Sequence, residues 1–192
     1  MLAFRHADRR FPFLWEGSGQ PDARWNAAGG RPVQYFADTA DGAWAEFLRH
    51  EEITTAEDVE TIRRAMWAIE LPDDGYAEPG LPVATLTGDR ATYGACQAEA
   101  RRLWEGGAPG LIARSAALRA GAASGWRVDG GLRAGPTRDG RTVALFGTRP
   151  ELVGWCAALG GPPPELLWKV RFFGETTGGA RDGGRTARVE AG

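Results

Sequence analysis

The chain has 192 residues, of which 43% are hydrophobic and 25% charged, and its formal net charge is −2. This length and composition predict one globular domain with a substantial core and exclude a disordered or fibrous chain. The nearly neutral charge argues against direct nucleic-acid binding through a general positive field.

Neither a membrane span nor a secretory signal is predicted, so we expect a cytoplasmic protein. No run approaches the ~18 apolar residues that a span needs, and the first ten residues carry four charges instead of an apolar stretch. Cys96 and Cys156 each fall in a stretch that predicts a helix, where small apolar packing roles are expected. The cysteines and the two histidines lack metal-ligand spacing, so no metal is expected.

Residues 1–20 are predicted to form an extended segment that packs on the body of the domain. The basic side chains of this segment could line a basic rim or simply face solvent: Arg5, His6, Arg9 and Arg10.

The stretch from residue 23 to residue 50 carries the clearest pattern. A glycine loop precedes a buried strand over 32–36, and Asp38 or Thr39 can cap the amphipathic helix that follows. The apolar residues of this helix recur at helical spacing: Ala40, Ala43, Trp44, Phe47 and Leu48. Glu46 lies on the flank of that face, where its carboxylate could look into a cleft or form an exposed ion pair with Arg49 or His50.

The other elements follow from capping signals and periodicity. Helices are predicted at 55–62, 93–104 and from the capping box at 148–151 to residue 159. Strands are predicted at 65–71, 81–86, 111–113, 142–146 and 167–173. Residues 116–140 read as a long loop or surface excursion, and disorder is expected over 175–192. The order of elements predicts a single mixed α+β domain over residues 1–174.

Several common catalytic signatures are absent from the sequence. It has no G-x-x-x-x-G-K-[ST] phosphate loop, no G-x-G-x-x-G and no G-x-S-x-G elbow. Chemistry is therefore left to carboxylate, arginine, serine and tyrosine side chains. Arg24, Tyr35 and Glu46, which the strand and helix should hold close together, suit an anionic, ring-bearing substrate such as a dinucleotide.

These residues match a known family pattern. Arg24-Trp25-Asn26 is followed by Tyr35 in a strand and by Glu46 on the next helix, 11 residues after the tyrosine. A serine, Ser115, follows the apolar strand of the stretch GAPGLIARSAAL. The chain resembles the RES domain, named for an arginine, a glutamate and a serine, over about residues 4–173.

The resemblance implies both a fold and an activity. RES-domain proteins are toxins partnered by an Xre-type antitoxin, and their fold is similar to that of ADP-ribosyltransferases of the diphtheria-toxin type. They break the nicotinamide–ribose bond of NAD and pass ADP-ribose to water, to phosphate or, in some members, to a protein. By resemblance, Glu46 and Arg24 are the catalytic residues. The residues expected to bind NAD are Arg24, Trp25, Tyr35, Glu46, Ser115 and Thr142.

Departures from the family pattern keep other functions open. Trp25 stands where some relatives carry tyrosine, Thr142 where some carry asparagine, and Arg114 where a proline is common. Residues 116–140 could form a lid. Each site residue also has a simpler role available, as a surface cation, a core strand residue or a turn hydroxyl. The alternatives are a mono-ADP-ribosyltransferase that modifies a protein, or a non-catalytic binding module that retains the pocket.

Overall fold

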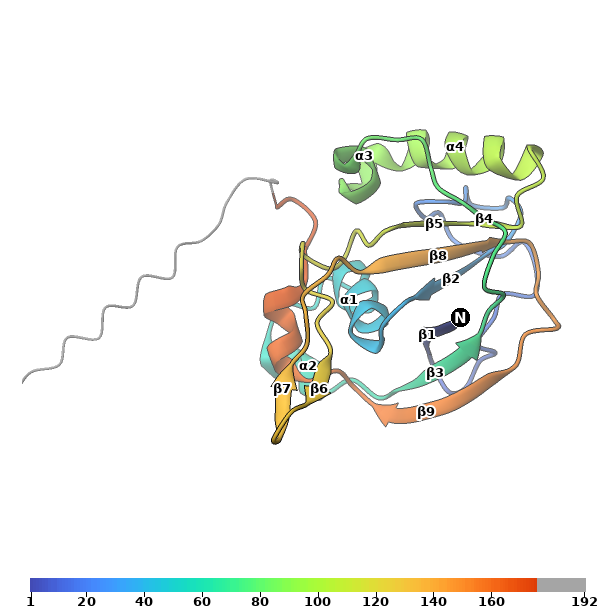
Figure 1. Cartoon of the computed structure of the whole chain (residues 1–192). Coiled ribbons are helices and arrows are strands. Elements are labelled where there is room, and N and C mark those ends of the chain that lie inside the picture. The colour runs from blue at the N-terminus through green and yellow to red at the C-terminus, as the bar shows by residue number, and fades with distance from the viewer. Residues whose placement is uncertain (176–192) are drawn as a thin grey trace, which may run out of the picture.

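A seven-stranded, mostly antiparallel sheet forms the centre of the molecule in the computed structural model, which describes residues 1–175 (Figure 1). The order across the sheet is β4-β5-β8-β2-β1-β3-β9, and β4 pairs with β5 in parallel. The strands of this sheet are β1 (Leu2–Ala7), β2 (Val33–Ala37), β3 (Arg64–Glu70), β4 (Tyr76–Ala77), β5 (Gly110–Arg114), β8 (Arg141–Phe146) and β9 (Gly154–Gly160).

The helices lie over one face of the sheet and at one of its ends (Figure 1). They are α1 (Ala40–His50), α2 (Ala56–Glu60), α3 (Val83–Thr87), α4 (Tyr93–Glu105) and the 3-10 helices η1 (Arg90–Thr92) and η2 (Pro164–Lys169). A separate hairpin joins β6 (Trp126–Val128) to β7 (Leu132–Ala134). The structure is thus a mixed α/β domain, as the sequence predicted.

Strand alternation decides which residues of β2 and β8 face the helices. Tyr35 pairs with Ala144, and Ala37 pairs with Thr142. Because successive side chains point to opposite faces, these four residues share one face. On that face Ala37 belongs to a buried cluster that includes apolar residues of α1, which we call the α1 cluster. Ala144 belongs to a second cluster that includes buried residues of α4, which we call the α4 cluster, and Tyr35 packs against it. Thr142 therefore faces the space between α1 and α4.

Most of the elements predicted from caps and clear periodicity are confirmed, the exception being the helix from the capping box at 148–151. Thr39 caps α1 by accepting a hydrogen bond from the Gly42 amide at 3.0 Å. Thr55 caps α2 in the same way, accepting from the Asp58 amide at 3.2 Å. The predicted strands at 32–36, 65–71, 111–113 and 142–146 and the helix at 93–104 are present within one or two residues. Local hydrogen bonds and a single apolar face were sufficient signals there.

Three predicted elements are wrong. Residues 83–87 form the short helix α3, not a strand, with Leu86 buried in the α4 cluster. Residues 154–160 form β9 instead of a helix, because they pair along β3 at the edge of the sheet. Residues 164–169 form η2 instead of the last strand, and η2 begins at the third of three consecutive prolines. In each case a tertiary partner overrode a weak local pattern.

Smaller corrections concern exposure and the N-terminal segment. Cys96 is buried as predicted, but Cys156 lies exposed in β9, not in a helix. Near the end of α4, Trp104 is exposed and stacks under the Arg31 guanidinium. The segment predicted as an extended packing strip contributes β1, an inner strand of the sheet. The predicted disordered tail lies, apart from Glu175, outside the described residues.

Strands β1 and β2 are neighbours, but one residue pair alone, Phe4 with Ala37, joins them. By contrast, β1 pairs with β3 along six residues. Beyond Phe4 the Arg5 guanidinium crosses the gap and donates a hydrogen bond to the Tyr35 carbonyl at 3.3 Å. The sheet is therefore open between these two strands, next to the face that carries Thr142.

Candidate active site

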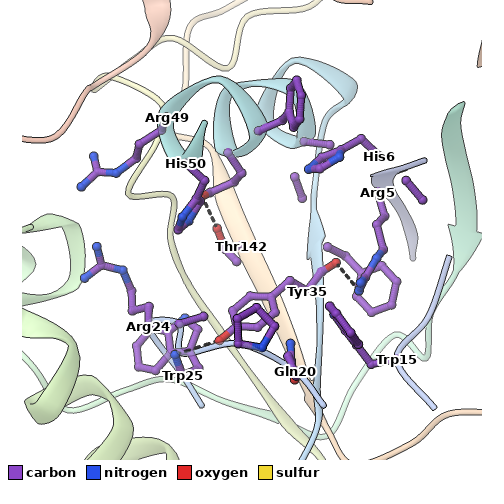
Figure 2. A pocket seen from close by; sticks show the side chains of 18 of the residues that line it. Arg5, His6, Trp15, Gln20, Arg24, Trp25, Tyr35, Arg49, His50 and Thr142 are labelled. Atoms are coloured by element: carbon purple, nitrogen blue, oxygen red, sulfur yellow. Dashed lines mark hydrogen bonds and ion pairs between the residues drawn. The ribbon is translucent and has the colours of Figure 1, made fainter. Parts of the chain in front are cut away.

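A cavity of about 920 Å³ lies between α1, the Tyr93 end of α4 and the sheet, and it extends to the opening between β1 and β2 (Figure 2). Its lining comes from β1, β2, α1, β8 and the segment between β1 and β2. This volume is within the range of pockets that enclose a drug-sized or cofactor-sized ligand. Of the residues predicted as a site, five line it: Arg24, Trp25, Tyr35, Glu46 and Thr142.

Glu46 is fixed by hydroxyl groups from two other elements. Its Oε1 accepts hydrogen bonds from Ser115 Oγ and Thr142 Oγ1, both at 3.3 Å. Its Oε2 lies 3.8 Å from His50 Nε2, one helical turn further along α1. The side chain remains 25% exposed. Glu46 therefore faces the cavity, as one of the two sequence interpretations had it, and its contact with His50 is an ion pair only when the histidine is protonated.

Ser115 lies behind Glu46 and is not among the residues that line the cavity. Its hydroxyl is buried and accepts hydrogen bonds from the amides of Ala117 and Leu118, at 3.2 and 3.1 Å. Because the Ser115 oxygen already accepts two hydrogen bonds, its hydroxyl proton is the group that is left to interact with the Glu46 carboxylate. Ser115 is thus both a turn hydroxyl and an orienting group for Glu46.

Arg24 is a buried cation, not a surface one. Its side chain is only 8% exposed and reaches from the N-terminal segment to the α3–α4 connection. Nη1 donates to the Thr85 carbonyl at 3.1 Å and to Thr92 Oγ1 at 3.0 Å, and Nη2 donates to the Gly88 carbonyl at 2.6 Å. The guanidinium also lies 5.0 Å from the centre of the Tyr93 ring. These contacts fix a positive charge in the wall of the cavity.

Tyr35 holds the two residues that follow Arg24 in the chain. Its hydroxyl accepts a hydrogen bond from the Trp25 amide at 2.8 Å and donates one to Asn26 Oδ1 at 2.9 Å. Burial raises the pKa of the Tyr35 phenol far above its usual value, so it stays neutral. The Trp25 side chain packs in the α4 cluster. The motif Arg24-Trp25-Asn26 is therefore held as a turn by the strand residue that the sequence placed beside it.

Arg49 is a site residue that the sequence suggested only as an ion-pair partner of Glu46. Its side chain is 1% exposed. Nη1 donates to the carbonyls of Ala116 and Arg171, both at 2.7 Å. Nη2 donates at 2.9 Å to the Gly88 carbonyl that also accepts from Arg24. Two guanidinium groups therefore meet at one backbone oxygen, a convergence that no spacing in the sequence reveals.

His50 completes this end of the cavity. Its ring contacts the Phe173 ring edge-on, with centroids 5.7 Å apart. Burial lowers the pKa of His50, and the neighbouring Glu46 carboxylate offsets part of that shift. The reaction end of the cavity, as we call it below, consists of Arg24, Glu46, Arg49, His50 and Thr142. Figure 2 shows the two arginines and His50 on the same side of the cavity as Thr142.

Arg5 and His6 of β1 line the opposite part of the cavity, while Arg9 and Arg10 are exposed. Burial lowers the pKa of Arg5 to about 10, so it remains charged at neutral pH. Burial, with the nearby Arg64 charge, lowers the pKa of His6 to about 3. His6 Nδ1 accepts a hydrogen bond from Arg64 Nε at 3.2 Å. Of the four positions predicted for a basic rim, Arg5 and His6 line the cavity, and Arg5 alone of these two carries a positive charge at neutral pH.

Over residues 1–175, no helix is long and apolar enough to cross a membrane. Within the same range, no group of three or more His, Cys, Asp or Glu side chains is arranged to hold a metal ion. Residues 117–140, which include the β6–β7 hairpin, are not among the cavity-lining residues.

The fold and the site together define a mixed α/β domain with a carboxylate held in a deep, arginine-walled cavity. The family model described as the RES domain matches residues 2–168, so the chain belongs to the RES domain family. The fold is similar to that of a chain in the crystal structure of the M. tuberculosis MbcT-MbcA toxin-antitoxin complex, with a TM-score of 0.57. That similarity covers 87% of this chain and 86% of the other, at 21% identity. Among curated proteins, none matches the sequence.

Proposed function

We propose that the protein is an NAD-consuming enzyme that breaks the bond between nicotinamide and ribose. The observation that carries the proposal is Glu46, a carboxylate fixed by Ser115 and Thr142 at the wall of a cavity large enough for a dinucleotide. Membership of the RES family supports the assignment of substrate. The ADP-ribosyltransferase-like fold expected from the sequence is part of the same proposal.

Glu46 would stabilise the reacting ribose. As the C1′–N bond breaks, nicotinamide leaves with the bonding electrons and the ribose gains oxocarbenium character. A fixed carboxylate beside that positive charge lowers the barrier, because its orientation costs nothing at the moment of reaction. Water or phosphate then bonds to C1′, and water loses a proton to the solvent. The hydroxyls of Ser115 and Thr142 keep the carboxylate directed at one place.

The arginines would bind the negatively charged part of the substrate. Arg24 and Arg49 bring two positive charges to the Gly88 carbonyl, next to the cavity. Their guanidinium groups already use several donors on the protein, so they would act chiefly through charge, with few donors left for direct contact. Tyr35 would act through the turn that it fixes, and its ring, with Trp25, would border the nicotinamide pocket.

We also propose that the protein is the toxin of a toxin–antitoxin pair. The family and the fold shared with a chain of a toxin-antitoxin complex support this role. An Xre-type antitoxin would restrain the toxin by covering the cavity mouth near Arg24. Full NAD turnover by a purified complex of the two proteins would contradict that blocking mode.

The test is NAD consumption by purified protein with and without phosphate. We expect wild type and the exposed control Glu105→Gln to consume NAD, and Glu46→Gln to lose ~100- to 1000-fold in rate. Dependence on phosphate would identify the acceptor, whereas a labelled protein with little free ADP-ribose would indicate a protein ADP-ribosyltransferase. Unaltered NAD after long incubation with wild type would overturn the proposal and favour a non-catalytic module.

A further inference from the structure

The cavity has a second part, which we call the arm, at the opening between β1 and β2. The arm is lined by Arg5, His6, Trp15, Phe36 and Arg64. It exists because β1 and β2 share a single residue pair and then diverge. Figure 2 shows Arg5, His6 and Trp15 together on the side of Tyr35 away from Arg24 and His50. The arm therefore leads away from Glu46 through the open sheet.

The arm contains positive charge that has no carboxylate within ion-pair distance among residues 1–175. The hydrogen bond to the Tyr35 carbonyl is the single polar contact that Arg5 makes within residues 1–175, and it is long at 3.3 Å. Arg64 donates to neutral His6 and makes no ion pair within the same residues. Asp8 also lines the arm, but the Arg10 guanidinium binds it at 2.8 Å. A largely desolvated guanidinium without an ion-pair partner, as at Arg5, is costly, so an anionic ligand would be strongly favoured here.

The walls of the arm are flat and aromatic. The Arg5 guanidinium lies 5.9 Å from the centre of the Phe36 ring. The His6 ring, neutral and stacked near Trp44, supplies a second flat surface. Trp15 is 37% exposed, so part of its surface remains open for contact. Aromatic faces beside unpaired guanidinium groups suit a planar base that carries a phosphate.

We propose that the arm binds the adenosine 5′-phosphate half of NAD, while the nicotinamide half lies at Glu46. This inference rests on the proposed function. Glu46 must lie at the bond that breaks, so the rest of the dinucleotide has to extend away from it. The arm leads in that direction and offers unpaired positive charge and flat walls. Arg5 would bind phosphate directly, and Trp15 would contact the base.

The test measures AMP binding by calorimetry, independently of turnover. We expect AMP to bind wild type and Glu46→Gln alike, and to bind Arg5→Gln at least tenfold more weakly, since a charge-assisted contact is lost. Trp15→Leu should weaken binding severalfold, and it serves as the second variant because the Trp15 side chain is 37% exposed. Arg9→Gln, an exposed arginine of the same segment, is the matched control. Thermal unfolding confirms that each variant is folded.

A second measurement compares NAD with nicotinamide mononucleotide, which lacks the adenosine half. In Arg5→Gln the ratio of kcat/KM for NAD to that for the mononucleotide should fall about tenfold. If AMP binding depends on Arg5 but the protein leaves NAD intact, the proposed role of the arm is supported and only the proposed reaction is contradicted. If AMP does not bind, or if wild type and both folded arm variants bind it equally, the proposal that the arm binds the adenosine 5′-phosphate half is wrong even if NAD is consumed.

Discussion

The two ends of the cavity satisfy their charges in different ways. At the reaction end, Arg24 and Arg49 together donate to four backbone carbonyls, and two hydroxyls hold Glu46. In the arm, Arg5 makes one long hydrogen bond within the described residues, to the Tyr35 carbonyl. The reaction end is therefore preorganised by the protein, whereas the arm leaves its binding groups free.

This difference has a physical basis. A group that stabilises a transition state must already be oriented, since reorganisation during the reaction raises the barrier. A group that binds a remote phosphate gains most if its donors are unused before the ligand arrives. Substitutions of the arginines at the reaction end should therefore change the stability of the protein, whereas substitutions in the arm should change ligand binding with little change in stability.

The largest expected effect contrasts two buried arginines. Arg49→Met should lower the free energy of unfolding by ~3 kcal/mol or more, because the carbonyls of Ala116, Arg171 and Gly88 lose buried donors. Arg5→Met should change it by less than ~1 kcal/mol, because the lost contact is weak and a desolvated charge disappears. Urea unfolding measures both, and the reverse order would refute the contrast.

The next effect concerns pH. His6 has a folded-state pKa of about 3 and an unfolded-state value of ~6.5, so the unfolded chain binds more protons between these values. Stability should be unaffected above pH 6.5 and should fall as pH decreases toward 3. Between pH 7.5 and pH 5, the titration of His6 should lower the free energy of unfolding by ~2 kcal/mol.

Urea unfolding of His6→Asn at the two pH values checks this. The variant should lose that part of the pH dependence, because asparagine does not titrate. His50→Asn, at the half-exposed histidine of the reaction end, should retain most of it. Parallel pH profiles for wild type and His6→Asn would contradict the burial of a neutral His6.

The smallest effect compares the two hydroxyls on Glu46. Ser115→Ala should lower kcat/KM for NAD about tenfold, because the carboxylate loses one orienting donor and the Ala117 and Leu118 amides lose their acceptor. Thr142→Ser keeps the hydroxyl at Glu46 and should change kcat/KM less than about threefold. Equal losses in both variants would show that the hydroxyl itself is not what matters at position 142.

The sequence by itself determined the first part of the site. Thr39, the apolar stripe of α1 and the alternation of β2 are local signals, and they placed Tyr35 and Glu46 correctly on a strand and the following helix. Local signals succeed here because a cap or an amphipathic face needs only nearby residues. The same reasoning failed for β9, whose conformation depends on pairing with β3, about ninety residues earlier in the chain.

Only the tertiary structure decided how the cavity is built. The meeting of Arg24 and Arg49 at Gly88, and the position of Ser115 behind Glu46, depend on contacts between distant segments. The opening between β1 and β2 depends on where their pairing stops. Such contacts leave no periodic pattern in the sequence. Any residue can supply the backbone carbonyl that accepts the hydrogen bond, so the identity of the accepting residue carries no signal. The sequence therefore identified most of the groups at the reaction end, and the fold determined which of them are held by the protein and which are free.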